Sequence, residues 1–462
     1  MDKFEEDLTT VLAREIDGFS KLLGCEKLTA GASQETYRID IESDCGSQRL
    51  ALRRSVPTLE TSSSVGAIDL ATEAQLFRLA VDAGIPEPQV HYVLEEKDGL
   101  GEGFIMQWLE GETLGQRIVR SDALAEVRPR LAAECGEALA RIHALQWQGT
   151  ALESALPVVS PEALIDETWA HYRDLAVPVP MIDFSWRWLK DNLPAQSRQT
   201  LVHGDFRNGN LMIGPEGIVA VLDWELAHVG DPVRDLGWLC VNSWRFGRSD
   251  LPVGGFGEIE QLLSAYRAES GIEVSHEELH FWQVFGSFWW AMATLRMANS
   301  WRTGETPSLE RPVIGRRSSE AQMDCVNLLM PGAFKLPHMD RDIARGTQLP
   351  MPAELLSGVA EFLKSDVAPV VEGHHSFLAR VAANSLGIAQ REFLHGSHLA
   401  EQECERLRKL LGREGTLDEL RLELVSQLRG DLPLDTPGLG DHLRQTVAGQ
   451  LAIDQPGYSA LK

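Results

Sequence analysis

The sequence is poor in lysine, and acidic residues outnumber basic ones. Only nine of its 462 residues are lysine, and none lies between Lys27 and Lys97. Its 43 basic and 68 acidic residues give a net charge of -25, which disfavours binding to nucleic acid or to anionic lipid. We therefore expect no nucleic acid among its partners and no docking on a charged membrane surface.

The chain also lacks paired cysteines and long apolar runs. Its six cysteines lie at least 20 residues apart, so there is no C-x-x-C pair to indicate a zinc cluster or a redox motif. No run of about 18 uncharged apolar residues is present, so we expect no membrane span. Residues 1–7 are acidic and do not resemble a secretory signal. These absences favour a cytoplasmic protein with free thiols.

Apolar patterning divides the chain into four predicted parts. Residues 1–108 alternate strand and helix patterns, which predicts a small antiparallel sheet with one inserted helix. Residues 109–335 are mainly helical, a proline-rich stretch marks 336–352 as a linker, and 353–462 show helical periodicity almost throughout. The predicted fold class is α+β: a two-lobed domain followed by an all-α domain.

Within the first part, residues 5–23 predict a helix because their apolar residues recur on one side. Strand patterns follow on both sides of a turn at 43–47, and a second amphipathic helix is expected over 69–83. Two more strands are expected at 89–95 and 103–108. The first lobe is therefore predicted to be built mainly from strands.

The most informative segment is a loop that follows a short apolar strand. Residues 203–210 read H-G-D-F-R-N-G-N, and Asp223 ends a later apolar strand. Phosphoryl transfer requires a carboxylate that accepts the proton of the acceptor hydroxyl, and oxygen ligands for magnesium on the triphosphate. Asp205 fits the first role, whereas Asn210 and Asp223 fit the second. A bare D-x-x-x-x-N spacing is common, so the prediction depends on the full set and its flanking strands.

With these residues the chain resembles the aminoglycoside phosphotransferase and choline kinase-like family, whose fold is protein-kinase-like. The family's H-G-D-x-x-x-x-N loop corresponds to residues 203–210, its Asp-Trp-Glu motif to 223–225, and its G-D-P-x-x-D-L motif to 230–236. The resemblance covers about residues 20–330. It implies ATP, or alternatively GTP, as the phosphate donor, Mg²⁺ as the metal and a small-molecule hydroxyl as the acceptor.

The resemblance also implies supporting residues around the catalytic loop. His203 belongs to the loop motif itself. Asp231 is expected to cap the helix that begins near residue 232, and Asp235 is expected to brace the loop. We expect all three to support the site rather than to carry chemistry.

The nucleotide side of the first lobe shows further matches. Gly31 and Ser33 lie in a turn similar to the family's phosphate-covering loop. Ala51 is expected to cover the adenine, and Gln107 and Trp108 stand where the family's hinge meets adenine through backbone groups. A lone glycine turn is weak by itself, so these matches depend on the rest of the lobe.

One position departs from the family's pattern, because Arg53 stands where the family commonly has lysine. Arginine stays charged and can hold a phosphate with two donors, so function is expected to persist, although Arg54 could make the contact instead. Arg53 shares a strand face with Ala51, which places it toward the α- and β-phosphates. Glu73 resembles the acid that pairs with this cation; the alternative is an ordinary exposed helix acid.

The acceptor pocket is expected from helices after residue 235. That region is rich in tryptophan and phenylalanine with interleaved arginines, and most of these aromatics are expected in the core. Clusters of tryptophan with arginine suit an apolar acceptor that bears an anionic group. Residues 222–236 resemble the kinase domains fused to acyl-CoA dehydrogenases, which implies a hydroxyacyl or acyl-CoA-type acceptor.

Two other functions stay open at this point. A pseudokinase would bind nucleotide and regulate a partner; the missing lysine favours it, whereas intact Asp205, Asn210 and Asp223 oppose it. An aminoglycoside phosphotransferase is the other alternative. The role of 353–462 is open, with homodimerisation or service as a lid as the plainer expectations. Four potential metal ligands recur there on one helix face, which are Glu392, His395, His398 and Glu401. Such spacing is more often found on a helix face that is simply exposed to solvent.

Overall fold

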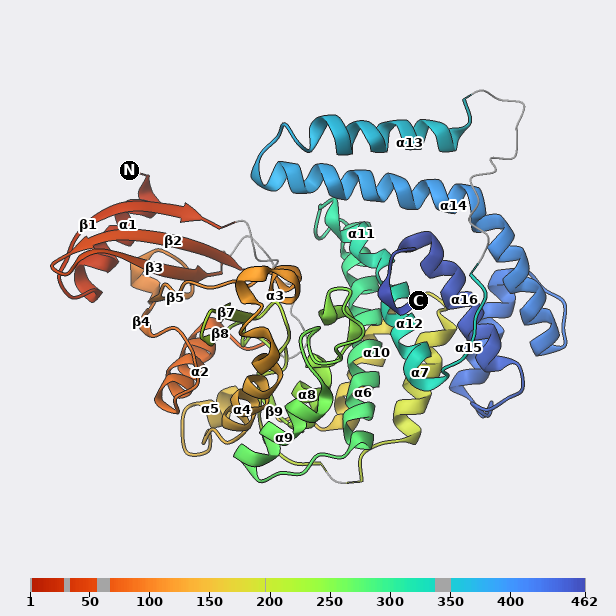
Figure 1. The fold of residues 1–462 in the computed structure, drawn as a ribbon, viewed down its shortest axis with the longest axis horizontal. Helices are drawn as coiled ribbons and strands as arrows, with labels where there is room; N and C mark the ends of the chain where they lie inside the picture. Colours follow the sequence, from red (N-terminus) through yellow and green to blue (C-terminus); the bar gives the residue numbers. More distant parts are fainter. Residues whose placement is uncertain (1, 29–33, 56–66, 196, 337–349, 462) are drawn as a thin grey trace. The chain divides into compact units, whose positions relative to one another are not determined.

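A computed structural model describes residues 2–28, 34–55, 67–195, 197–336 and 350–461 (Figure 1). The chain forms two compact units. The first comprises Met1–Ser160, Gln196–Cys240 and Trp244–Leu279. The second comprises Pro161–Ala195, Val241–Ser243 and His280–Lys462. Each unit is built from three separate stretches of the chain, whereas each predicted part is one continuous stretch. The boundaries of the predicted parts stay a prediction.

A five-stranded antiparallel sheet with the order β1-β2-β3-β5-β4 opens the first unit. Its strands are β1 Phe19–Lys27, β2 Glu35–Ser43, β3 Gly46–Arg54, β4 Val90–Val93 and β5 Gly103–Gln107. Helix α1, Lys3–Glu15, packs against this sheet, and α2, Leu70–Asp82, contacts β4 and β5 (Figure 1). These elements match the predicted first lobe.

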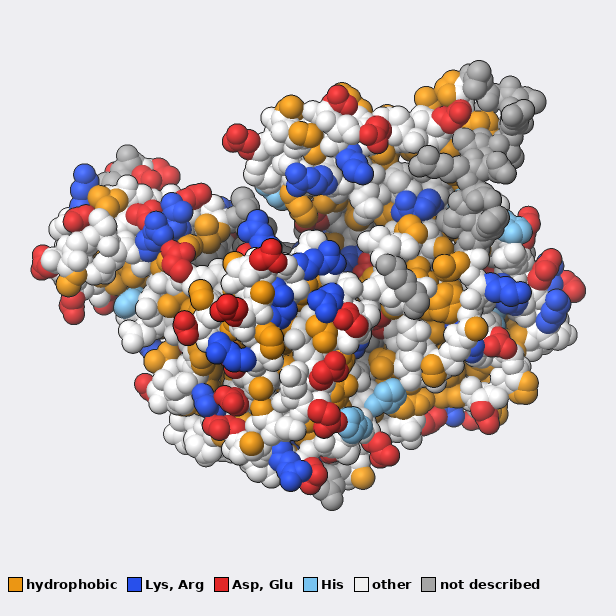
Figure 2. Space-filling view, viewed as in Figure 1, with side chains coloured by type: hydrophobic (Ala, Val, Ile, Leu, Met, Phe, Trp, Pro, Cys, Tyr) orange, Lys and Arg blue, Asp and Glu red, His pale blue; other side chains and the backbone are white. Residues whose placement is uncertain are grey.

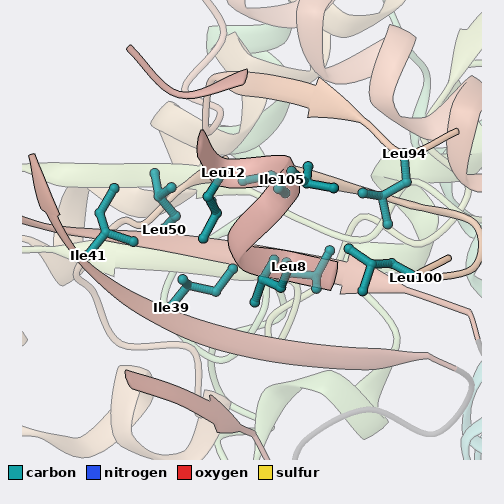
Figure 3. Packing of buried hydrophobic residues seen from close by; sticks show 10 residues of the cluster. Leu8, Leu12, Ile39, Ile41, Leu50, Leu94, Leu100 and Ile105 are labelled. Atoms are coloured by element: carbon teal, nitrogen blue, oxygen red, sulfur yellow. The ribbon is translucent and has the colours of Figure 1, made fainter. Parts of the chain in front are cut away.

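The core of this lobe lies between α1 and the sheet. Figure 3 shows Leu8 and Leu12 of α1 beside the buried strand residues Ile39, Ile41, Leu50 and Ile105. Leu52 of β3 belongs to the same buried cluster. Successive side chains of a strand point to opposite faces, so the burial of Leu50 and Leu52 directs Ala51 and Arg53 to the face away from α1. The hydrophobic pattern of β3 thereby aims Arg53 at the candidate site.

The predicted helix over 5–23 is wrong in its second half. Helix α1 ends at Glu15, and β1 begins at Phe19, directly after Gly18. Gly18 has a φ of +70°, a left-handed conformation that glycine adopts at little steric cost, and it turns the chain from helix into strand. Phe19 packs against the core of the sheet as a strand residue.

The remainder of the first unit surrounds two small strand pairs. Strand β6 pairs with β9, and β7 pairs with β8, both antiparallel. The loops 203–210 and 222–227 connect one pair to the other, so they run side by side. The elements are α3 Gly115–Arg120, α4 Leu131–His143, α5 Leu152–Ala155, β6 Thr200–Val202, β7 Leu211–Gly214, β8 Gly217–Val221, β9 His228–Gly230, α8 Val233–Leu239 and α9 Ile259–Ser270.

The regular elements of the second unit are all helices among the residues that the structure describes. Helix α13 lies along the first half of α14, and the rest of α14 contacts α15 and α16 (Figure 1). Helix α10 begins in the last residues of the first unit. The helices are α6 Pro161–Asp174, α7 Pro180–Asp191, α10 His276–Arg302, α11 Glu310–Arg316, α12 Ser318–Leu329, α13 Pro352–Phe362, α14 Gly373–Leu411, α15 Leu417–Arg429 and α16 Leu439–Asp454.

Several expectations from composition can be compared with this structure. Within the described ranges, every helix falls short of the length and apolar content that crossing a bilayer requires. All six cysteines are described, and all are free. The same described residues hold no group of three or more side chains placed to bind a metal. On α14, Glu392 pairs with Arg316, and His398 contacts the amide of Gln402 at 2.9 Å.

Candidate active site

Asp205 lies in the loop between β6 and β7, and three side chains hold its carboxylate. Oδ1 accepts hydrogen bonds from Trp238 Nε1 at 2.7 Å and from Arg207 Nε at 3.0 Å. Oδ2 accepts from Asn210 Nδ2 at 2.7 Å. The side chain is 12% exposed, so the carboxylate is fixed in orientation and still accessible. This is the arrangement that a proton acceptor for a bound hydroxyl requires.

The backbone of the catalytic loop is anchored to Asp235 of α8. The Asp235 carboxylate accepts the N–H groups of His203 at 2.8 Å and Gly204 at 2.9 Å. Burial alone would raise the pKa of Asp235, but hydrogen bonding and charge from His143 outweigh it and lower the pKa to about 2. Asp235 therefore stays ionised and supports the loop, as its predicted role requires.

Gly204 is needed for steric reasons. Its φ is +86°, and a Cβ at this position would lie 2.2 Å from the carbonyl oxygen of Leu226. The two loops that carry the motifs are therefore in direct backbone contact here. The glycine of the H-G-D motif permits that contact.

The two other predicted supports also lie beside the loop. His203 Nδ1 accepts the N–H of Asp205 at 3.2 Å, and its ring lies 4.6 Å from that of the buried Trp224. Burial lowers the pKa of His203, which keeps the imidazole neutral. Asp231 accepts the N–H of Val233, the first residue of α8, at 3.0 Å. Asp231 thus stands one residue before the N-cap of α8, which is Pro232, and its side chain accepts a hydrogen bond from the first helical N–H.

Asn210 and Asp223 meet at the open end of the β7–β8 pair. The N–H of Leu222, which precedes Asp223, donates to the carbonyl of Asn210 at 2.8 Å. Asp223 has a φ of +71°, a left-handed conformation that costs a residue with a side chain about 1–3 kcal/mol and is concentrated at functional sites. The amide nitrogen of Asn210 faces Asp205, so its amide oxygen faces the opposite direction.

Trp224 holds the backbone that follows Asp223. Its N–H donates to Glu73 Oε1 at 3.2 Å, and its indole Nε1 donates to Glu87 Oε1 at 3.1 Å. The tryptophan is completely buried. Two acids from the first lobe therefore fix the strained turn at Asp223.

Arg53 connects the sheet to this turn. Its Nε lies 3.2 Å from Glu73 Oε2, and its Nη2 donates to Asp223 Oδ1. Glu73 is not an exposed helix acid, because its side chain is 1% exposed. Arg54 points to the opposite face, where it binds Glu35 and stacks on Phe4 of α1. Of the two candidate arginines, the structure brings Arg53 to the site.

When ionised, the acids around this arginine, which are Glu73, Asp223 and Glu225, carry more negative charge than it neutralises. Burial raises the pKa of Glu73 to about 7 in spite of the opposing charge of Arg53. Burial, followed by the charge of Asp223, raises the pKa of Glu225 to about 7 as well. A divalent cation would offset this excess, and carboxylate and amide oxygens are its preferred ligands. The residues present therefore fit Mg²⁺, and Asn210 and Asp223 are the side chains that could bind it.

The structure says less about the remaining residues that were predicted to contact the nucleotide. Ala51 is buried on the Arg53 face of β3. The N–H of Gln107 donates to the carbonyl of Gln89 at 2.8 Å, so this group is already in use. Trp108 donates its indole N–H to Glu110 at 2.9 Å. Gly31 and Ser33 lie outside the described residues.

Sequence reasoning assigned no role to three residues that the structure brings to this site. Arg207 stands inside the motif, and its guanidinium lies 4.4 Å above the ring of Trp244. Its position two residues after Asp205 was the signal that could have identified it. Trp238 was counted only among the aromatics of the acceptor region. Glu87 had no signal, because its contact with Trp224 joins positions 137 residues apart.

Two family models match separate parts of the chain. A model of the phosphotransferase enzyme family matches residues 24–271. A second model, for a domain of unknown function, matches residues 369–458. The first match contains every residue of the candidate site, and the second contains the helices α14, α15 and α16 in full.

Two curated relatives show how the chain compares in length. Acyl-CoA dehydrogenase family member 10 of Mus musculus is 28% identical over 305 residues, which cover 62% of this chain and 27% of the relative. Acyl-CoA dehydrogenase family member 11 of Gallus gallus is 25% identical over 400 residues, covering 78% and 48%. The chain therefore spans less than half of the length of either curated relative.

A solved structure establishes the fold. The crystal structure of a Ralstonia eutropha protein predicted to be an aminoglycoside phosphotransferase superposes with a TM-score of 0.56 and 20% sequence identity. The alignment covers 70% of this chain and 96% of that structure. At this identity the likeness extends to the fold alone, and it confirms the predicted protein-kinase-like architecture.

The buried Glu87 predicts a pH-dependent stability. Burial, opposed by the Trp224 hydrogen bond and then reinforced by the charge of Glu73, raises the pKa of Glu87 well above its usual value. In the unfolded chain a glutamate has a pKa of about 4.3. As the pH rises past that value, only the unfolded chain loses this proton, so the free energy of unfolding falls.

We therefore expect Glu87→Gln to melt at a higher temperature than the wild type at pH 8, by about 2–4 °C for each kcal/mol gained. The difference in melting temperature should shrink toward pH 5, where Glu87 of the wild type is protonated in the folded state and partly protonated in the unfolded chain. Calorimetry of both proteins across this range measures the effect. Glu273→Gln, at an 80% exposed side chain, serves as the control. Parallel curves for the wild type and Glu87→Gln would contradict the buried, protonated state.

Proposed function

Because the chain belongs to the phosphotransferase enzyme family, we propose that it transfers the γ-phosphate of ATP to a hydroxyl group of a small molecule. The observation that supports this most is the meeting of Asp205, Asn210 and Asp223 from two separate loops, 203–210 and 222–227. Asp205 and Asn210 are joined by a side-chain hydrogen bond, and Asn210 is joined to the turn of Asp223 through the backbone. A proton acceptor and a metal-binding pair thereby share one site.

In the proposed reaction the oxygen of the acceptor hydroxyl bonds to the γ-phosphorus as the bond to the bridging oxygen of ADP breaks. Asp205 accepts the hydroxyl proton, and its three hydrogen bonds orient it for that step. Asn210 and Asp223 would hold Mg²⁺, which supplies charge neutralisation on the triphosphate when bound. ADP and a phosphate ester are the products.

Two arginines supply the positive charge of the protein itself. Arg53, held by Glu73 and Asp223, would contact the α- and β-phosphates. Arg207 lies beside Asp205, which suits it to stabilise the charge that spreads over the phosphoryl group during transfer. Its stacking on Trp244 fixes the plane of the guanidinium.

For the acceptor we propose a hydroxyacyl or acyl-CoA-type compound. The named relatives are acyl-CoA dehydrogenase family members, and the aromatic and arginine side chains beside Asp205 suit an apolar acceptor with an anionic group. A polycationic aminoglycoside is disfavoured, because Arg207 would repel it at the catalytic acid. A pseudokinase is disfavoured by the hydrogen-bonded arrangement of Asp205. Cytoplasmic location stays a prediction.

Removing the proposed proton acceptor should abolish transfer without preventing nucleotide binding. We expect Asp205→Ala to lower turnover by about 100-fold or more, because general-base catalysis contributes about that much. ADP release with a panel of hydroxylated acceptors measures turnover, and calorimetric titration measures ATP binding. Asp122→Ala, at an exposed acid of the same unit, is the control. Wild-type turnover in Asp205→Ala would exclude this mechanism.

The two neighbouring arginines provide a matched pair for nucleotide binding. Arg53→Met should weaken MgATP binding by about tenfold or more, because a charge-assisted contact to phosphate is lost. Arg54→Met should leave the affinity unchanged, since Arg54 faces α1. Arg53→Lys, which keeps the charge, should recover part of the loss. Weaker binding in Arg54→Met with normal binding in Arg53→Met would reverse the assignment.

A further inference from the structure

Helix α13 presents large apolar side chains to solvent along one side. Leu355 is 58% exposed, Val359 51% and Phe362 56%. Steps of four and three residues place these side chains on one face of a helix, and we call them the α13 stripe. Figure 2 shows hydrophobic side chains at the surface over α13. The other large apolar side chains that are more than half exposed lie in separate segments of the described chain, at Leu114, Val158, Leu336, Val370, Phe393 and Leu422.

The opposite side of α13 is already in use. Ala353 is buried, Leu356 and Ala360 are partly buried, and the helix packs along the first half of α14. A helix that is apolar on both sides is usually covered on both sides. Here only the side toward α14 is covered within the chain's described residues, so the α13 stripe is available for a partner.

Charge along the two helices indicates what that partner is. Residues 352–362 of α13 carry two acids, Glu354 and Glu361, and no basic residue. Residues 373–391 of α14 carry Arg380, Arg391 and two histidines, and no acid. Phe377 of α14 is 46% exposed, and Arg380, one turn later, is exposed too. The α13 surface is therefore apolar and acidic, whereas the exposed surface at the start of α14 is apolar and basic.

We propose that this hairpin is a homodimer interface in which the α13 stripe of each copy packs on Phe377 and Arg380 of the other. A two-fold axis makes the same contact twice, so modest patches on each copy add together. Two helical hairpins joined in this way form a four-helix bundle, which is a common way to bury such stripes. Because the net charge of -25 makes two copies repel each other, association depends on this local complementarity.

The oligomeric state of the full chain tests the proposal. Sedimentation velocity over a range of concentrations should show a dimer for the wild type. Val359→Asp places a charge in the middle of the stripe and should give a monomer with an unchanged circular dichroism spectrum. Leu422→Asp, at a 57% exposed position on α15 outside the stripe, should remain a dimer. A wild type that is monomeric at every concentration would overturn the proposal, as would equal behaviour of the two variants.

Charge reversal identifies the contact itself. Glu361→Arg and Arg380→Glu should each raise the dimer dissociation constant by about tenfold or more, and the double variant should recover most of the loss. Additive losses in the double variant would contradict the proposed pairing of α13 with α14. Both measurements read assembly and not phosphate transfer, so their outcome is independent of the proposed function.

Discussion

The ion contacts of Arg53 join the sheet of the first lobe to the turn that carries Asp223. One guanidinium, aimed by the hydrophobic pattern of β3, meets Glu73 of α2 and Asp223 from the second half of the unit. A buried charge requires all of its partners, because removal of one leaves the others unpaired at a cost of several kcal/mol. The strained backbone at Asp223 is tolerated because these contacts and those of Trp224 fix it from several sides.

The acids of the site form an electrostatic system that favours a cation. Glu73 and Glu225 both have a pKa of about 7, so their ionisation is poised near neutral pH. Binding of a divalent cation beside Asp223 would favour their charged forms, and a proton would compete with it. Arg207, on the far side of Asp205, supplies positive charge where the phosphoryl group would pass.

Much of this arrangement could be predicted from the sequence because it is local. The H-G-D-F-R-N-G-N loop and the acid that ends the next strand lie within 21 residues, and strand patterns on both sides fix their relative place. Alternation along β3 placed Arg53 on the correct face. The same local reasoning failed at residues 16–23, where apolar spacing fits both a helix and a half-buried strand and Gly18 decides between them.

Contacts between distant segments could not be predicted in this way. The bond from Trp224 to Glu87 joins positions 137 residues apart, and no periodicity marks Glu87 as the partner. Alternation along β3 indicates the face of Arg53 but not its ion pair with Asp223, which lies 170 residues away. The division of the chain into two units that are each discontinuous in sequence could not be predicted either. It depends on how helices pack in three dimensions, and each helix taken alone has the same amphipathic pattern in either unit.

The most direct measurement is phosphorus NMR of the protein incubated with ATP, Mg²⁺ and hydroxylated acyl compounds. We predict that the γ-phosphate signal of ATP declines while a phosphate-ester signal of the acceptor grows in equal amount. ATP that stays intact with every acceptor, or free phosphate as its only phosphorus product besides ADP, would contradict the assignment of this site as a phosphotransferase.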